Sequence, residues 1–195
     1  MKLAAMLSAA LVLTGCMTSH SIKSETNEIP APSDDSAVVV FMRSSFIMGG
    51  VSMNLFEKSD GELSFVGTMA DKSKIAHRTK PGKKVFMTHI QDVDFMPAEV
   101  EANKTYYVII RPIWPSRFAP TPLKTDGTTK FNTDDDRFLK WKDGTQRYEL
   151  AESADAWFSE NKAAYEAIYD AGWEEFQSLS PEKQAERVLT PSDGI

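Results

Sequence analysis

The chain has 195 residues, of which 42% are hydrophobic, 10% aromatic and 26% charged, and its formal net charge is -6. This composition excludes a collagen-like repeat, a multi-pass membrane protein and a strongly basic nucleic-acid-binding protein, and it allows one ordinary domain with an appendage. The single cysteine excludes an internal disulfide and a cysteine-based zinc site.

The first residues have the layout of a secretory signal. A positive start is followed by an apolar run that is too short to span a bilayer, and small residues come next. The lone cysteine follows directly, in the order Leu13-Thr14-Gly15-Cys16. We therefore expect residues 1–15 to be a signal peptide that is removed and takes no part in the fold.

The residues Leu13-Thr14-Gly15-Cys16 resemble the bacterial lipobox. In that family the signal is cleaved before the cysteine, and its thiol and the new amino terminus are acylated, so the resemblance implies a lipid (palmitate-type) anchor on Cys16. Several acyl chains hold a protein stably, since each buried CH₂ contributes about 0.8 kcal/mol. The alternatives are a buried free cysteine and a plain signal peptide followed by a chance cysteine.

Met17 follows the candidate anchor. Resemblance to enterobacterial lipoproteins would place Asp there in proteins that stay at the inner membrane, so the resemblance implies the outer membrane and its periplasmic face. Residues 16–36 are polar, contain prolines and show no apolar period. Such a segment buries too little surface to offset its ordering entropy, and we expect it to be a flexible tether.

Residues 37–125 carry the pattern of a β-sandwich module. The run Ala37–Arg43 is β-branched and apolar, which is typical of a strand buried on both faces. Two alternating stretches, 51–57 and 63–69, flank a turn that ends in Asp60-Gly61 and predict a hairpin. Seven or so short strands at this spacing indicate a small antiparallel sandwich. Further strands are expected near residues 73–79, 84–90, 98–101 and 105–111, with turns at Pro81-Gly82 and at Asn103, which favours a positive φ.

Three stretches of this module carry a second resemblance. They read VVVFMR over residues 38–43, PGK over residues 81–83 and EVEANKTYYV over residues 99–108. In this order they resemble a family of bacterial envelope lipoproteins with a β-sandwich domain of unknown function, although Asn103 stands where that family usually has Gly and no Pro follows Arg43. The resemblance covers about residues 37–112 and implies a fold and an envelope location, without an activity.

Residues 126–195 are expected to form a mostly helical region packed on the module, which makes the fold class α+β, mainly β. Before it, the proline-rich stretch 114–125 favours an extended edge strand or loop. Thr133 is the expected N-cap of a short helix that ends near Lys142, and a strand follows at 145–150. A long helix is expected from a Ser153 cap to about residue 178, and a second one begins at Ser180-Pro181.

The long helix carries an aromatic stripe. Packing of this stripe on the protein's own sheet is the favoured interpretation, because burial of large side chains is a sufficient reason for it. A partner-binding surface is the alternative. The main members of the stripe are Trp157, Tyr165, Tyr169, Trp173 and Phe176.

Six cations fall within thirteen residues around the Pro81-Gly82 turn. They are a candidate surface for lipid phosphates, lipopolysaccharide or an acidic protein, because each charge near an anionic membrane contributes about 1 kcal/mol. A solvated hairpin, or a patch neutralised by the acidic residues of the C-terminal region, is the alternative that we favour. The candidate residues are Lys72, Lys74, Arg78, Lys80, Lys83 and Lys84.

A catalytic or metal site would need a convergent group of side chains. The candidate set is His77 and His89 with acids from Asp92, Asp94 or residues 134–136, but two histidines are few for a metal site, and each is explained as a surface or strand residue. Residues 134–136 lack the spacing of a calcium loop and are explained by a helix start.

We therefore expect a non-catalytic, lipid-anchored accessory or interaction protein of the cell envelope. No cofactor, metal or nucleic acid is expected, and its partners would be the membrane, through Cys16, and an envelope protein or anionic surface. A periplasmic hydrolase or metal-dependent enzyme that uses His77 and His89 is the alternative function. A stabilising partner of a neighbouring membrane complex is a third.

Overall fold

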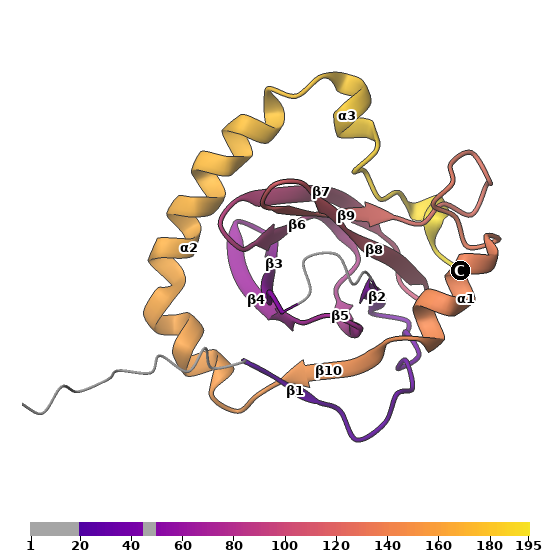
Figure 1. Ribbon diagram of the computed structural model, residues 1–195, viewed down its shortest axis with the longest axis horizontal. Coiled ribbons are helices and arrows are strands. Elements are labelled where there is room, and N and C mark those ends of the chain that lie inside the picture. Colours follow the sequence, from indigo (N-terminus) through magenta and orange to yellow (C-terminus); the bar gives the residue numbers. More distant parts are fainter. Residues whose placement is uncertain (1–19, 45–49) are drawn as a thin grey trace, which may run out of the picture.

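The structure, a computed structural model, describes residues 20–44 and 50–195. Two β-sheets pack face to face, and one long helix, α2 (Ala154–Gln177), runs along the outside of the second sheet (Figure 1). The expected class, a mainly β sandwich with a C-terminal helical region, is confirmed. The expected signal peptide and Cys16 lie outside the described residues.

The larger sheet is mixed, whereas the sequence suggested antiparallel pairing throughout. It consists of β1 (Ser21–Lys23), β10 (Gln146–Leu150), β5 (Ser73–Thr79), β2 (Ala37–Arg43), β8 (Thr105–Ile113) and β9 (Arg117–Pro122), in that spatial order. The β10–β5 and β2–β8 pairs are parallel. Parallel neighbours need a long crossover, and here the second sheet lies between β2 and β8 in sequence, a connection that strand patterns alone do not disclose.

The smaller sheet is antiparallel. Its strands are β4 (Glu62–Met69), β3 (Met53–Ser59), β6 (Gly82–His89) and β7 (Val93–Val100), in that spatial order. The β3–β4 turn places Asp60 at φ 52° and Gly61 at φ 84°, which is the pair of positive φ angles that a tight hairpin turn requires. Asn103 has φ 61°, as predicted.

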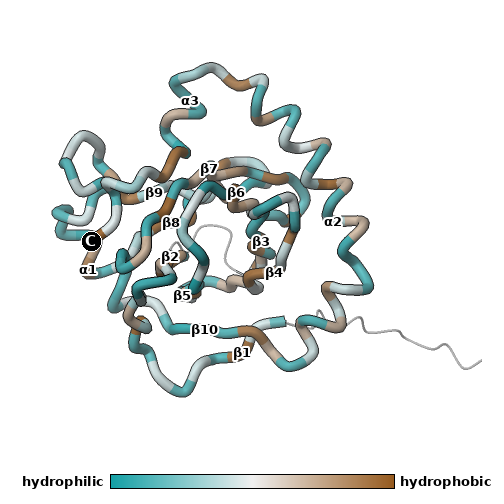
Figure 2. Tube along the Cα trace, turned by 180° about the vertical axis from the view of Figure 1, so that it is seen from behind, coloured by the Kyte–Doolittle hydropathy of each residue, from teal (hydrophilic) through white to brown (hydrophobic). Residues whose placement is uncertain are grey.

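The core lies between the two sheets. Strand β2 is buried along its whole length, because the second sheet covers one face and residues of the C-terminal region cover the other. Phe41 of β2 meets Phe86 of β6 across the core at a ring distance of 4.9 Å, and Phe138 of α1 (Asp136–Asp143) packs on the opposite side of the large sheet. Figure 2 shows the hydrophobic stretches recurring on the strands that enclose this core.

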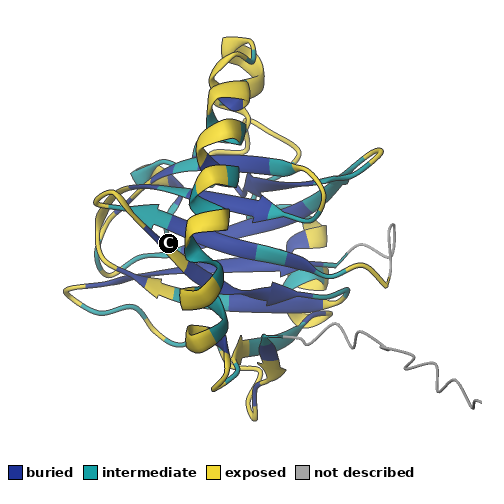
Figure 3. Cartoon of the chain, turned by 90° about the vertical axis from the view of Figure 1, so that its left-hand side faces the viewer, coloured by how far each residue is buried: buried dark blue, intermediate teal, exposed yellow. Residues whose placement is uncertain are grey.

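The aromatic stripe of α2 packs on the outer face of the small sheet, as the sequence predicts. Phe95 of β7 contacts Tyr169, Trp173 and Phe176 at ring distances of 5.2 to 5.7 Å. The opposite side of α2 is exposed to solvent (Figure 3). Helix α2 therefore adds a third layer to the molecule.

The chain after α2 returns to the sandwich. A short helix, α3 (Pro181–Ala185), is followed by a segment in which Leu189 forms a parallel bridge with Ala98 of β7. The last residue, Ile195, exchanges backbone hydrogen bonds with Thr105 of β8 at 2.8 and 3.0 Å. A single 3₁₀ turn, η1 (Pro191–Asp193), lies between these two contacts.

The proline-rich stretch forms β9 at the edge of the large sheet, as expected. Helix boundaries differ in detail. The N-cap of α1 is Asp135, whose side chain accepts from the Arg137 backbone N–H at 2.8 Å, and not Thr133. Ser153 precedes α2 without a side-chain capping bond. Thr133 and Asp135 are both suitable N-cap residues for α1, and tertiary contacts decide between them.

The prediction of a flexible tether is wrong for residues 20–36. Strand β1 pairs antiparallel with β10, and the Ser24 backbone N–H donates to the Arg147 carbonyl at 2.9 Å. Farther along, the Arg78 guanidinium donates to the Ala31 carbonyl and to Ser36 Oγ, both at 2.7 Å. Hydrogen bonds hold most of this segment, together with Ile29 on the core and the His20 ring stacked on Trp157, so its low overall hydrophobicity gave a misleading signal.

Candidate functional site

The six cations near the Pro81-Gly82 turn do not share one surface. Lys74 and Lys84 are buried, and the Nζ of Lys74 donates to the carbonyl of Lys142 at 2.7 Å. Arg78 is exposed but binds residues 31–36. The other three cations, Lys72, Lys80 and Lys83, have exposed side chains.

Buried polar side chains from both sheets meet at one end of the sandwich. Glu57 of β3 points inward on the face that also carries Leu55, and Lys84 enters from the neighbouring strand β6. His77 and Thr79 approach from β5 of the opposite sheet. The side chains of Glu57 and Lys84 are only 8% and 1% exposed, which makes their pairing obligatory. We call Glu57, His77, Thr79 and Lys84 the intersheet cluster.

Every member of the intersheet cluster is hydrogen-bonded. The two Glu57 oxygens contact His77 Nε2 at 2.5 Å and Thr79 Oγ1 at 2.8 Å, and Lys84 Nζ lies 3.1 Å from Glu57 Oε1. Lys84 Nζ also donates to Thr79 Oγ1 at 2.5 Å and to the Lys80 carbonyl at 2.6 Å. The ion pair Glu57–Lys84 lies within the small sheet, and the hydrogen bonds of His77 and Thr79 to it join the two sheets at this end.

The charge state of Glu57 follows from this environment. Burial by itself would raise the pKa of Glu57, but the hydrogen bond and charge of His77, the hydroxyl of Thr79 and the charge of Lys84 outweigh burial. They lower the pKa from 4.5 to about 2, so the carboxylate is ionised at neutral pH. Both carboxylate oxygens of Glu57 already accept hydrogen bonds within the cluster, so the cluster can hold a charge in place.

The structure does not bring the two candidate histidines together. His77 belongs to the intersheet cluster, whereas His89 of β6 lies on the other face of the small sheet, with its ring 5.5 Å from that of Tyr165. Burial lowers the pKa of His89, and the charge of Asp92 only partly offsets this. In the part of the chain that the structure describes, no group of three or more His, Cys, Asp or Glu residues is arranged to hold a metal ion.

The candidate acids are engaged separately. Asp92 accepts a hydrogen bond from Ser116, and Asp135 caps α1. The carboxylate of Asp94 accepts from the Phe95 backbone N–H at 2.9 Å and pairs with Arg187 at 3.2 Å. None of these contacts joins an acid to either histidine.

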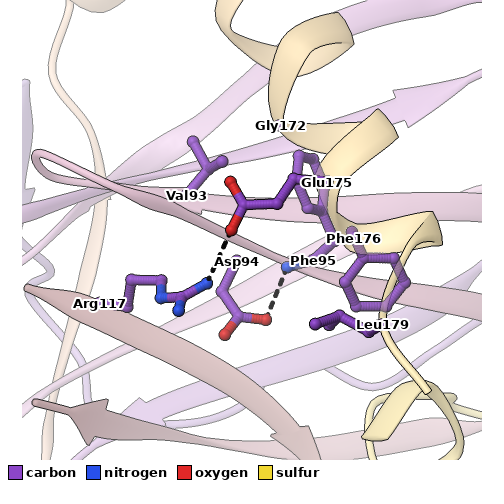
Figure 4. A pocket seen from close by; sticks show the side chains of 8 residues that line it. All are labelled: Val93, Asp94, Phe95, Arg117, Gly172, Glu175, Phe176 and Leu179. Carbon is purple, nitrogen blue, oxygen red and sulfur yellow. Dashed lines mark hydrogen bonds and ion pairs between the residues drawn. The ribbon is translucent and has the colours of Figure 1, made fainter.

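Asp94 borders a small cavity between α2 and the sandwich (Figure 4). Its volume is about 20 Å³, which is room for one water molecule. Arg117 of β9 reaches across it to Glu175 of α2 at 3.6 Å. Gly172 allows the close approach, since a Cβ there would overlap Val93 and lie 3.1 Å from a ring carbon of Phe95. This region serves helix docking.

A larger cleft of about 450 Å³ lies between the β3–β4 turn, α2 and the C-terminal segment. Trp173 and Leu189 supply apolar walls, and Lys83 and Lys84 also line the cleft. Of the six predicted cations, these two are therefore next to an open groove, but Lys84 directs its ammonium group into the intersheet cluster.

Comparisons with known proteins leave the function to be argued from the residues: neither the models of known protein families nor the curated proteins give a match. Over residues 20–44 and 50–195, no helix has the length and apolar character needed to cross a bilayer.

Sequence reasoning missed the intersheet cluster. The alternation of β3 places Glu57 on the same side as Met53 and Leu55, so the sequence could have predicted an acidic side chain in the core. Its partners could not be predicted, because His77 and Thr79 lie on a strand of the other sheet whose position depends on the tertiary fold.

Proposed function

We propose that the protein is a non-catalytic accessory lipoprotein of the bacterial envelope, anchored through Cys16 at the periplasmic face of the outer membrane. The observation that carries the proposal is the sequence Leu13-Thr14-Gly15-Cys16 after a signal-like start. Acyl chains on this cysteine supply membrane attachment without a spanning helix.

The position of β1 sets the distance between the proposed anchor and the folded domain. Strand β1 begins at Ser21, five residues after Cys16. Five residues span at most about 18 Å when fully extended. An anchor at Cys16 would therefore hold the β1–β10 edge of the large sheet close to the lipid headgroups, instead of displaying the domain at a distance.

An interaction role fits the exposed cations better than a catalytic one fits the histidines. Lys80 and Lys83 flank the β5–β6 turn, and Lys83 borders the cleft of about 450 Å³. We assign an acidic envelope partner to this end of the molecule, since exposed cations steer and orient negatively charged surfaces.

Separation of inner and outer membranes tests the location. The wild-type chain should sediment with the outer membrane, whereas Cys16→Ala should be lost from both membranes. The Met17→Asp variant should be found at the inner membrane if the residue after the cysteine determines sorting. Equal distribution of wild type and Cys16→Ala would overturn the proposal.

Charge reversal tests the partner surface. Lys80→Glu with Lys83→Glu should reduce crosslinking of the protein to envelope components by several-fold without loss of folding, because both side chains are exposed. Lys140→Glu with Lys183→Glu is the control for net charge, because both of these side chains are exposed. Lys84 is left unchanged, since it is buried with Glu57. An unchanged crosslinking pattern would remove this end of the molecule as the partner surface.

A further inference from the structure

A second cavity lies on the opposite side of the sandwich from α2's aromatic stripe, beside the edge strand β9. Its volume is about 300 Å³, at the lower end of the range for small-molecule pockets. Strands β8 and β9, the 124–131 loop and α3 enclose it. The residues that matter for its chemistry are Arg111, Thr121, Lys124, Lys130, Phe131 and Glu186.

Two cations of this cavity have no acidic partner. The Arg111 Nε donates to Thr121 Oγ1 at 2.7 Å, and the guanidinium carbon lies 4.6 Å from the centre of the Phe131 ring. The Nζ of Lys130 lies 5.3 Å from the centre of the same ring. Considering the described residues only, neither Arg111 nor Lys130 has a carboxylate oxygen within 4.0 Å.

The acids around the cavity are paired with other cations. Asp193 binds Lys124 at 2.8 Å, and Arg187 lies 3.2 Å from Asp94 and 3.7 Å from Glu186. Burial lowers the pKa of Arg111 and the charge of Arg187 lowers it further, while the charges of Glu186 and Asp94 offset only part of this. The half-buried guanidinium is thus short of negative charge, which a bound anion would supply.

We infer that this cavity binds a small phosphate-bearing molecule, with the phosphate between Arg111 and Lys130 and the body of the molecule against Phe131. A phosphate monoester carries a charge of about -1.5 to -2 at neutral pH and three acceptor oxygens, which matches two unpaired cations. A carboxylate would supply one charge. The planar fork of Arg111 suits oxygen pairs, and the hydroxyl of Thr121 holds that fork in position.

The same chemistry is offered by a soluble phosphate ester and by a lipid headgroup. The volume of about 300 Å³ admits either a small ester or one headgroup. Phenyl phosphate represents the first and dihexanoyl phosphatidic acid the second. The inference does not depend on acylation of Cys16, so its failure and the failure of the proposed function are separable.

Calorimetric titration of the purified full-length chain tests the inference. Phenyl phosphate should bind wild type, and Arg111→Gln should weaken binding at least tenfold while Lys130→Gln weakens it several-fold. Arg111→Lys, which keeps the charge without the fork, should fall between wild type and Arg111→Gln. Lys140→Gln is the matched control for Lys130→Gln, because Lys140 is an exposed cation outside the lining of the cavity, and it should leave binding unchanged.

Thermal unfolding without ligand identifies any variant that fails to fold, and Lys130→Gln, an exposed residue, then carries the test. Binding of phosphatidic acid but not phenyl phosphate would assign the site to headgroups, the reverse to soluble esters, and both results uphold the inference. No binding of either phosphate at millimolar concentration, or equal binding of benzoate and phenyl phosphate, would overturn it.

Discussion

At the scale of single residues, Glu57 is the side chain that holds the intersheet cluster together at one end of the sandwich. Its removal leaves Lys84 buried without a counter-charge, and breaking a buried pair typically costs 3–5 kcal/mol. We expect Glu57→Gln to lower the free energy of unfolding by about 3 kcal/mol in urea titrations. Glu62→Gln is the control, because Glu62 lies on the same hairpin and its ion pair with Lys162 of α2 is exposed, so this change should have little effect.

The same residue predicts a pH dependence. The pKa of Glu57 is depressed from 4.5 to about 2 by folding, so its contribution to stability is fully present above 4.5 and is lost as the pH falls through 2. This shift corresponds to about 3 kcal/mol. The difference in unfolding free energy between wild type and Glu57→Gln should therefore shrink from pH 6 to pH 2.5. A constant difference over that range would contradict the assigned pKa.

At the scale of elements, the docking of α2 depends on a glycine. Ala usually stabilises an exposed helix by about 1 kcal/mol relative to Gly. At Gly172 we expect the opposite sign, because the added Cβ would overlap Val93 and press on Phe95. Gly172→Ala should destabilise the chain by about 1–3 kcal/mol in urea unfolding followed by tryptophan fluorescence. Adding Val93→Ala should recover part of the loss, and stabilisation by Gly172→Ala alone would disprove the close contact.

Elements with strong local signals were predictable from the sequence. The β3–β4 turn at Asp60-Gly61, the fully buried run of β2 and the aromatic stripe of α2 all formed as expected. Segments held by long-range hydrogen bonds were not. Strand β1 pairs with β10, which in turn pairs in parallel with β5. The hydrophobic patterns of β1 and β10 do not predict these partners.

The candidate sites show the same division. The acid at an inward position of β3 can be predicted from the sequence. That Arg111 and Lys130 lack an acidic partner cannot, because it depends on the tertiary contacts that pair the nearby acids with Lys124 and Arg187. The six cations are dispersed for the same reason, since Lys74, Arg78 and Lys84 each bind a partner from a different part of the fold.

At the scale of the whole molecule, the helical region and the sandwich form one structure. Deletion of residues 153–195 would uncover Phe56, Phe65 and Phe95 and remove the backbone pairs of Leu189 and Ile195. We expect the remaining chain to aggregate and to bind a hydrophobic dye, because a large apolar face becomes exposed. Co-expression of residues 153–195 as a separate chain should restore part of the solubility. A soluble, monomeric fragment with native circular dichroism would contradict this expectation.

The central claim is the proposed lipid on Cys16, which would give the folded domain its place in the cell. Metabolic labelling with palmitate, followed by mass analysis of the N-terminal peptide, measures it directly. The wild-type chain should incorporate label and yield a peptide that starts at residue 16 with acyl groups attached, and Cys16→Ala should take up none. An unlabelled wild-type chain that still retains residues 1–15 would contradict the account.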